Sequence, residues 1–249
     1  MSKRRKELGR DKAYERILAG IIFGELPAGG SVDEKGLALR YGIGLASVRE
    51  ALHRLSLEGL IERISRRGTR IAALDLSGLH AVFEARVVVE ERCAALAAER
   101  ADATDIRAMK EAFAGYEAVI RNRDFRTLVQ MDIAFHHALA AASKNPPLAK
   151  MLICLHKDAM RFWYFGLLRL PAGEVRADIA SHLAIVAAIE RCDPVAAAAA
   201  MREVLGHFPD MVRSFMSGVM LNQQERPANE RGKAAWRLRK RSEKAPATA

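Results

Sequence analysis

Four side chains in the second half of the chain have the types and the spacing of metal ligands. Asp132 and His136 are four residues apart in a segment of helical periodicity, so both project from one face of a helix. His182 and His207 lie in two later segments of the same kind. A carboxylate combined with imidazoles suits zinc, nickel or manganese. The same spacing also occurs in ordinary contacts on a helix surface, and on spacing alone both interpretations stay open.

The segments that carry these residues predict an all-helical domain over residues 75–221. Apolar residues recur there at helical spacing, and proline or aspartate residues stand where the segments begin. No strand is expected in this domain. The pattern predicts six helices, at about residues 76–101, 103–122, 124–143, 146–169, 172–191 and 194–218.

A different pattern precedes this domain and predicts a small DNA-binding unit over residues 11–74. Three short helices are expected, the second capped by Asp33 and separated from the third by the turn Gly42-Ile43-Gly44. Two strand-like runs then flank the basic tip Ser65-Arg66-Arg67-Gly68. This order is that of a winged helix-turn-helix, whose third helix fits the major groove of DNA.

The third helix and the hairpin tip carry the candidate DNA contacts. Arg49 stands near the exposed start of the helix, where side chains reach base edges, and the hairpin can reach phosphates or the minor groove. The alternative is a three-helix packing unit with ordinary surface arginines. The candidates are Ser47, Arg49 and His53 on the helix, with Arg66, Arg67 and Arg70 on the wing.

The charge distribution favours a polyanionic partner for the ends of the chain. Of the formal net charge of +10, residues 1–74 carry 15 Lys/Arg against 9 Asp/Glu, and residues 222–249 carry 8 against 3. The helical domain is nearly neutral, with 17 against 18. Clustered basic residues suit phosphate contacts, although solubility is the simpler explanation. We expect residues 1–10 to be a flexible basic arm and residues 222–249 a disordered basic tail.

The cysteines and the hydropathy pattern predict a cytoplasmic protein. Cys93, Cys154 and Cys192 are scattered, which argues against a disulfide framework and a zinc ribbon and favours buried thiols. No apolar core of a signal peptide follows the basic N-terminus. No run of about 18 apolar residues, the length of a membrane span, occurs in the sequence.

Two strings in the first domain resemble the winged helix of GntR-family transcription regulators. They are LPAGGSVDEKGLA at residues 26–38 and SVREALHRLSLEGLI at residues 47–61, and the resemblance covers about residues 12–74. The family usually reads Ser-Arg-Thr-Pro where this chain has Gly44-Leu45-Ala46-Ser47. A helix cap and a frequent DNA contact are therefore absent, while Arg49 is retained. The resemblance implies DNA binding, at an operator that need not match the common family sites.

The helical domain resembles the FadR-type effector domain (FCD) of the same regulators over about residues 76–215. The strings that carry this resemblance are FEARVVVE (83–90), DIAFH (132–136), SKN (143–145) and HLAIVAAI (182–189), followed by Asp193 and AMR (200–202). Many such domains hold a metal with one Asp and three His and bind a small organic acid above it. In register, Asp132, His136 and His182 match three ligands, while Val204 stands at the fourth. His207 follows one turn later.

The resemblance also implies residues that bind the effector. Arg86 matches a position that points into the pocket, where a guanidinium can clamp a carboxylate. The alternative for this residue is an ion pair with Glu90, one turn later on the same helix, which would contribute little to stability. Arg161 is a second candidate for the pocket wall. His137 and His156 are left outside the predicted site.

The sequence thus predicts a mainly α protein with an N-terminal winged helix-turn-helix and a six-helix, FCD-like bundle. We expect no enzyme but a dimeric transcription regulator that binds a palindromic operator in double-stranded DNA. A small carboxylic acid, with or without a divalent metal, would modulate its affinity for DNA. Two alternatives stay open, namely a metal-dependent enzyme built on the helical body and an architectural DNA-binding protein that senses no ligand.

Overall fold

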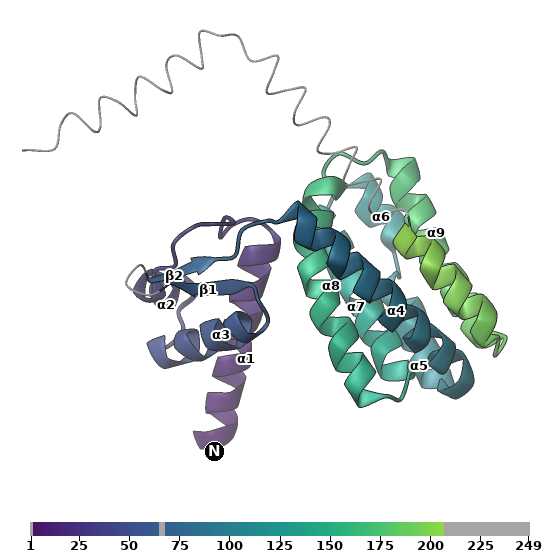
Figure 1. Cartoon of the computed structure of the whole chain (residues 1–249), viewed down its shortest axis with the longest axis horizontal. Coiled ribbons are helices and arrows are strands. Elements are labelled where there is room, and N and C mark those ends of the chain that lie inside the picture. The colour runs from purple at the N-terminus through teal and green to yellow at the C-terminus, as the bar shows by residue number, and fades with distance from the viewer. Residues whose placement is uncertain (1, 65–67, 207–249) are drawn as a thin grey trace, which may run out of the picture. The chain divides into compact units, whose positions relative to one another are not determined.

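The computed structural model describes residues 2–64 and 68–206 of the chain (Figure 1). Its first part consists of α1 (Ser2–Ile22), α2 (Glu34–Tyr41), α3 (Leu45–Leu57), β1 (Ile61–Ile64) and β2 (Gly68–Ile71). Its second part consists of α4 (Leu76–Arg100), α5 (Ala103–Ala112), α6 (Tyr116–Arg121), α7 (Phe125–Ala142), α8 (Pro146–Leu167) and α9 (Ala172–Glu190). Residues 194–206 are also helical. The predicted fold class, a winged helix before a helical domain, is confirmed.

The winged helix forms around the contact between α1 and α3. Ile17 of α1 and Leu52 and Leu55 of α3 are buried there with at most 1% of their surface exposed. The strands β1 and β2 pair antiparallel, with Ile61 opposite Ile71, and both isoleucines face this core. Because one face of α3 is fixed by these apolar contacts, its opposite face is left exposed to solvent.

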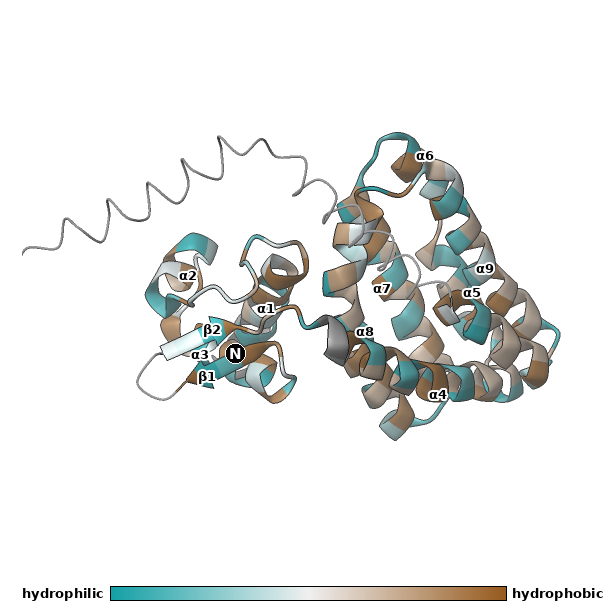
Figure 2. Ribbon diagram, turned by 45° about the horizontal axis from the view of Figure 1, so that its top comes forward, coloured by the Kyte–Doolittle hydropathy of each residue, from teal (hydrophilic) through white to brown (hydrophobic). Residues whose placement is uncertain are grey.

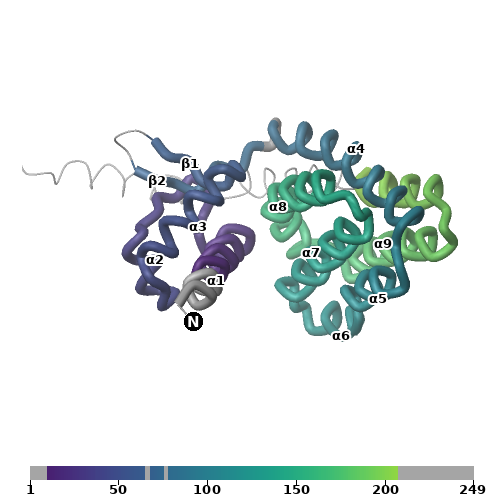
Figure 3. Tube along the Cα trace, turned by 90° about the horizontal axis from the view of Figure 1, so that it is seen from below, coloured from purple at the N-terminus to yellow at the C-terminus, as the bar shows by residue number. Residues whose placement is uncertain are grey.

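The helical domain includes the long helix α4, which packs against α7, α8 and α9 and runs along one edge of the domain (Figure 3). Helix α7 also packs against α8 and α5. Hydrophobic and hydrophilic residues alternate along these helices, as expected for elements with one buried face (Figure 2). The largest fully buried side chains of this domain are Leu96, Met109, Phe135, Leu139, Leu152, Leu167 and Ile185.

Side-chain caps fix the starts of several helices where the sequence predicted them. Asp102 and Asp105 form a reciprocal capping box at α5, and Asp124 accepts a hydrogen bond from the backbone N–H of Thr127 at the start of α7. Asn145 caps α8, whose first two positions are prolines. These caps set the register in which α7 and α8 present their inner faces.

Two predicted boundaries differ from the structure. The stretch predicted as one helix at 103–122 is divided into α5 and α6, because Gly115 adopts a left-handed conformation with φ of 76°. The predicted flexible arm at residues 1–10 is instead helical from Ser2, in a segment rich in Lys, Arg and Glu, which favour helices. The predicted tail at 222–249 lies outside the described residues.

No helix in the described part of the chain combines the length and the apolar character that crossing a bilayer requires.

Candidate metal centre and DNA interface

The candidate site lies on the inner face of α7. Asp132 and His136 share that face, as their spacing predicted, and have 4% and 1% of their surface exposed. His182 of α9 is equally buried and places Nε2 3.5 Å from Oδ1 of Asp132. The structure therefore brings together the three residues that the sequence selected in the described part of the chain.

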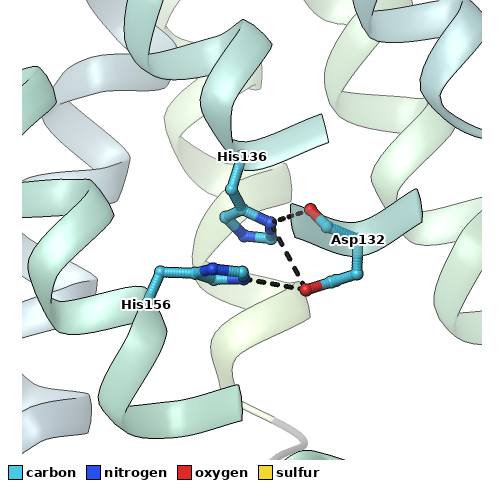
Figure 4. Close-up of side chains that lie close together, drawn as sticks. All are labelled: Asp132, His136 and His156. Carbon is cyan, nitrogen blue, oxygen red and sulfur yellow. Dashed lines mark hydrogen bonds and ion pairs between the residues drawn. The ribbon is translucent and has the colours of Figure 1, made fainter. Parts of the chain in front are cut away.

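A third histidine, His156 of α8, joins this group although the sequence analysis left it out. Its Nε2 lies 2.8 Å from Oδ2 of Asp132, and its ring stacks on that of His136 with centroids 4.0 Å apart (Figure 4). The expectation that His156 stands outside the site was therefore wrong. Its signal was a polar residue on the buried stripe of α8, between Leu152 and Ala159.

Two charged residues of α4 complete the buried cluster. Arg86 donates a hydrogen bond from Nε to Oε1 of Glu90 at 2.6 Å, and Oε2 of Glu90 lies 3.1 Å from Nε2 of His136. The guanidinium of Arg86 also lies 3.5 Å from that nitrogen. We call Arg86, Glu90, Asp132, His136, His156 and His182 the buried cluster.

The charges of the buried cluster compensate one another. Burial alone would raise the pKa of Glu90, but the positive charges of Arg86 and His136 lower it to about 2. Burial opposes the ionisation of Asp132 as well, yet His136 and His156 lower the pKa of this carboxyl below its usual range. Burial favours neutral His136, but the carboxylates Asp132 and Glu90 raise its pKa above the ordinary value. The two carboxylates thus lie against the guanidinium of Arg86 and against His136, whose charged form they favour.

His156 is the neutral member of the pair of stacked imidazoles. Burial and the positive charge of neighbouring His136 lower its pKa to about 3. Because the Asp132 carboxylate is ionised, His156 donates the hydrogen bond between them from Nε2. This bond fixes the orientation of the carboxylate and leaves Oδ1 directed toward His182.

His182 offers the clearest donor for a cation. Its Nδ1 lies 2.8 Å from the backbone carbonyl of Asp178, which can only accept, so the proton sits on Nδ1. The lone pair of Nε2 then faces a carboxylate oxygen of Asp132, and among the residues that the structure describes Nε2 is buried without a hydrogen-bond partner. His136 also directs Nδ1 at a backbone carbonyl, that of Asp132 at 3.0 Å. Its Nε2 faces Glu90 at 3.1 Å, whereas Nε2 of His182 is turned toward the Asp132 carboxylate, as metal-binding imidazoles are. One carboxylate surrounded by three imidazoles is a donor set that suits a divalent ion.

Three other residues that the sequence analysis discussed for this domain are not part of the buried cluster. Val204 is buried, with 9% of its surface exposed, and its aliphatic side chain offers no donor atom. His207 lies outside the described residues. Arg161 is buried, and its guanidinium donates a hydrogen bond to the backbone carbonyl of Ala72, a residue that follows β2. The role of Arg161 in effector binding therefore remains a prediction.

The candidate DNA interface begins at the turn between α2 and α3. Asp33 caps α2 through the N–H of Lys35, and Gly42 ends that helix in a left-handed conformation with φ of 61°. Gly44 stands at the N-cap of α3 and offers no side-chain cap, as the departure from the family pattern predicted. The start of α3 is therefore set by the backbone geometry of this turn, without a side-chain cap.

The exposed face of α3 presents the predicted contacts. Arg49 is well exposed, with 63% of its side chain accessible, and pairs with Glu34 of α2 at 2.8 Å. His53 is exposed on the same helix, and Ser47 is half-buried. On β2, Arg70 is exposed and pairs with Glu62 at 2.6 Å. Arg66 and Arg67 lie outside the described residues.

Fold and site together define a class of protein in which a winged helix precedes a helical domain with a buried polar centre. Residues 10–71 match the family described as "Bacterial regulatory proteins, gntR family", and residues 81–207 match the FCD domain. The chain therefore belongs to the gntR family of bacterial regulatory proteins and carries an FCD domain.

Individual relatives agree with this assignment. The chain is 24% identical to the uncharacterized HTH-type transcriptional regulator YdhC of Bacillus subtilis, over 56% of this chain and 62% of that protein. It is 24% identical to the Nta operon transcriptional regulator of Aminobacter aminovorans, over 82% of this chain and 96% of that protein. The structure of E. coli McbR/YncC covers 83% of this chain and 97% of its own length, with a TM-score of 0.74 at 18% identity. This last likeness concerns the fold.

Proposed function

We propose that the protein is a transcription regulator whose affinity for operator DNA changes when a small carboxylic acid binds its helical domain. The observation that carries this proposal is the buried cluster. A bundle that needed only stability would gain little from burying two ion pairs, because desolvation offsets their attraction. Arg86 offers a guanidinium for a carboxylate, and Asp132 with the histidines offers a site for a divalent metal beside it.

We further propose that the regulator acts as a dimer on a palindromic operator in the bacterial cytoplasm. One winged helix contacts few base pairs, so two heads on a two-fold site are needed for useful specificity. Light scattering of the protein alone and with a candidate operator measures the mass of each species. A monomer that occupies a single half-site would contradict the dimer.

An operator titration tests the central proposal. The upstream DNA of the gene is labelled, and its affinity for the protein is measured with and without each acid of a panel of hydroxy, keto and dicarboxylic acids. At least one acid should change the affinity severalfold, and equal binding throughout would contradict ligand response. Unchanged binding of unrelated DNA provides the control for a general salt effect.

Two alternative functions, a metal-dependent enzyme and an architectural DNA-binding protein, predict different results when the protein is mixed with the acids. A metal-dependent enzyme built on the buried cluster would consume the acid, which NMR spectroscopy of the incubated mixture would detect. An architectural protein would bind DNA without response to any acid. The relatives named as transcriptional regulators and the winged helix favour the regulator.

A further inference from the structure

We infer that His156 of α8 is the fourth ligand of a divalent metal held by Asp132, His136 and His182. The inference rests on the proposed metal site and names a donor that the sequence pattern does not supply. The sequence offers Val204 at the fourth position, and an isopropyl group cannot coordinate a metal. The structure places the imidazole of His156 2.8 Å from Oδ2 of Asp132, the carboxylate whose Oδ1 faces His182.

The proposed metal would lie between two hydrogen-bond acceptors that face each other, one on His182 and one on Asp132. Nε2 of His182 and Oδ1 of Asp132 are 3.5 Å apart, and the carbonyl of Asp178 selects the tautomer in which Nε2 has a lone pair. Bonds of about 2.1 Å to a tetrahedral metal place neighbouring ligand atoms about 3.4 Å apart. The observed separation therefore matches two ligands of one ion, and the buried Nε2 then has its partner.

His156 lies close to two of the other proposed ligands. One potential ligand atom each from Asp132, His136 and His156 lies within 4.8 Å of the others, and all three residues are buried. His182 joins this group through Asp132, whose Oδ1 it faces at 3.5 Å. In the metal-free state His156 donates its Nε2 proton to Asp132. To coordinate an ion, the ring would hold its proton on Nδ1 so that the lone pair of Nε2 is free for the metal. The charge of the ring would be the same in both tautomers.

Packing on α8 restrains the position of the His156 ring. Leu152 and Ala159, one turn before and one turn after it on α8, are fully buried. The stacked ring of His136 covers one face of the imidazole. The resulting set of three imidazoles and one carboxylate comes from α7, α8 and α9 and suits zinc or nickel.

A cobalt titration tests the inference with a readout that does not depend on DNA binding. Chelator-stripped protein is titrated with Co²⁺, whose visible absorption reports the number and the geometry of its ligands, and zinc displacement gives the relative affinity. Wild type should bind one ion per chain. His156→Gln keeps an N–H that can hold Asp132 but lacks the imidazole, and we expect it to weaken the metal by about a hundredfold or more. His137→Gln, which changes the exposed neighbour of His136, should bind as wild type does.

A second variant guards against loss of folding. His156→Gly leaves a space for free imidazole, and added imidazole should restore both metal binding and the wild-type cobalt spectrum. If His156→Gln binds cobalt as tightly as wild type while His182→Ala does not, His156 only positions Asp132 and the inference is wrong. If wild type takes up neither cobalt nor zinc, the inference is also wrong. The proposed function as a ligand-responsive regulator is contradicted by neither result if an acid still changes the affinity for DNA. It is contradicted only if no acid changes that affinity.

Discussion

Nε of Arg86 lies 2.6 Å from Oε1 of Glu90, and both side chains are almost completely buried. The sequence allowed two interpretations of Arg86, an effector clamp and a helix pair with Glu90. The structure shows the pair, and it also places the guanidinium 3.5 Å from Nε2 of His136. An exposed pair at this spacing contributes less than about 1 kcal/mol, whereas removing one partner of a buried pair costs about 3–5 kcal/mol.

The first prediction is that Arg86 anchors the acid. In the Arg86→Ala variant, an acid that raises the melting temperature of wild type should no longer do so, because the carboxylate loses its bidentate partner. Calorimetric titration of the same acid measures the affinity directly. An equal affinity in wild type and variant would remove Arg86 from the effector site.

Two further variants separate this role from stability. Arg202→Ala removes an arginine that pairs with Glu91 of α4 but is well exposed, and it should keep the response to the acid. Arg86→Met combined with Glu90→Gln leaves no unpaired charge in the core, so it should fold while still failing to bind the acid.

The second prediction concerns Arg49, which pairs with Glu34 in the free protein and must exchange this partner for DNA. Arg49→Ala should weaken binding to the operator by about 1–3 kcal/mol if the side chain contacts a base edge. Fluorescence anisotropy with operator and unrelated DNA provides the measurement. Arg176→Ala also removes one exposed arginine from an ion pair, with Glu117, but lies on α9 and should bind DNA normally.

The third prediction is that the arginines of the wing contact phosphates. Replacing Arg66, Arg67 or Arg70 should lower the affinity for all DNA sequences and reduce the slope of log K against log salt by about one each. Arg70 makes the sharpest test, because within the described residues its replacement removes one exposed ion pair, with Glu62. A loss confined to the operator would instead indicate that the wing reads bases.

The sequence predicted the fold and those residues of the site that lie close together along the chain. Asp132 and His136 were found because both lie on one helix, where spacing determines the shared face. His156 lies 24 residues from Asp132, and only the packing of α7 against α8 brings the two side chains together. Local periodicity assigns His156 to a buried stripe but does not identify what that stripe faces.

The environments of Arg86 and Arg161 could not be predicted from local periodicity either. The helical spacing of Arg86 and Glu90 predicted their contact, but only the folded bundle shows that this pair is buried against His136. Arg161 was assigned to the pocket from its position in the sequence, whereas its hydrogen bond goes to the carbonyl of Ala72, 89 residues away. Long-range contacts of this kind leave no mark in a local pattern.

The fourth prediction distinguishes His156 from His207, the ligand that the sequence offered as a substitute for the one missing at Val204. If α8 supplies the fourth donor, His207→Ala should leave the metal content measured by elemental analysis at one ion per chain. Val204→His should bind metal at least as tightly as wild type, because it restores the donor of the family pattern. Loss of the ion in His207→Ala would show that His207 is a ligand.

The fifth prediction concerns Asp158 of α8, whose pKa is raised by burial to about 6 despite the neighbouring Arg161. The folded state therefore holds the proton of Asp158 more tightly than the unfolded chain, where the pKa is about 4. The stability that this proton contributes is complete below about pH 4 and is lost as the pH rises through about 6. Because the side chain is partly exposed, we expect the loss to be about 1–2 kcal/mol rather than the full value of the shift.

Asp158→Asn cannot ionise, so its stability relative to wild type should be greater at pH 7.5 than at pH 4.5 by about the same 1–2 kcal/mol. Urea unfolding of both proteins at the two pH values, followed by circular dichroism, measures this difference. Asp124→Asn provides a control of opposite sign. The hydrogen bond from Thr127 lowers the pKa of Asp124, so its contribution is present above the ordinary pKa and declines as the pH falls. Asn also caps helices, so this variant retains the start of α7. If Asp158→Asn gains no stability relative to wild type between pH 4.5 and pH 7.5, then Asp158 is not held in its protonated form by burial on α8.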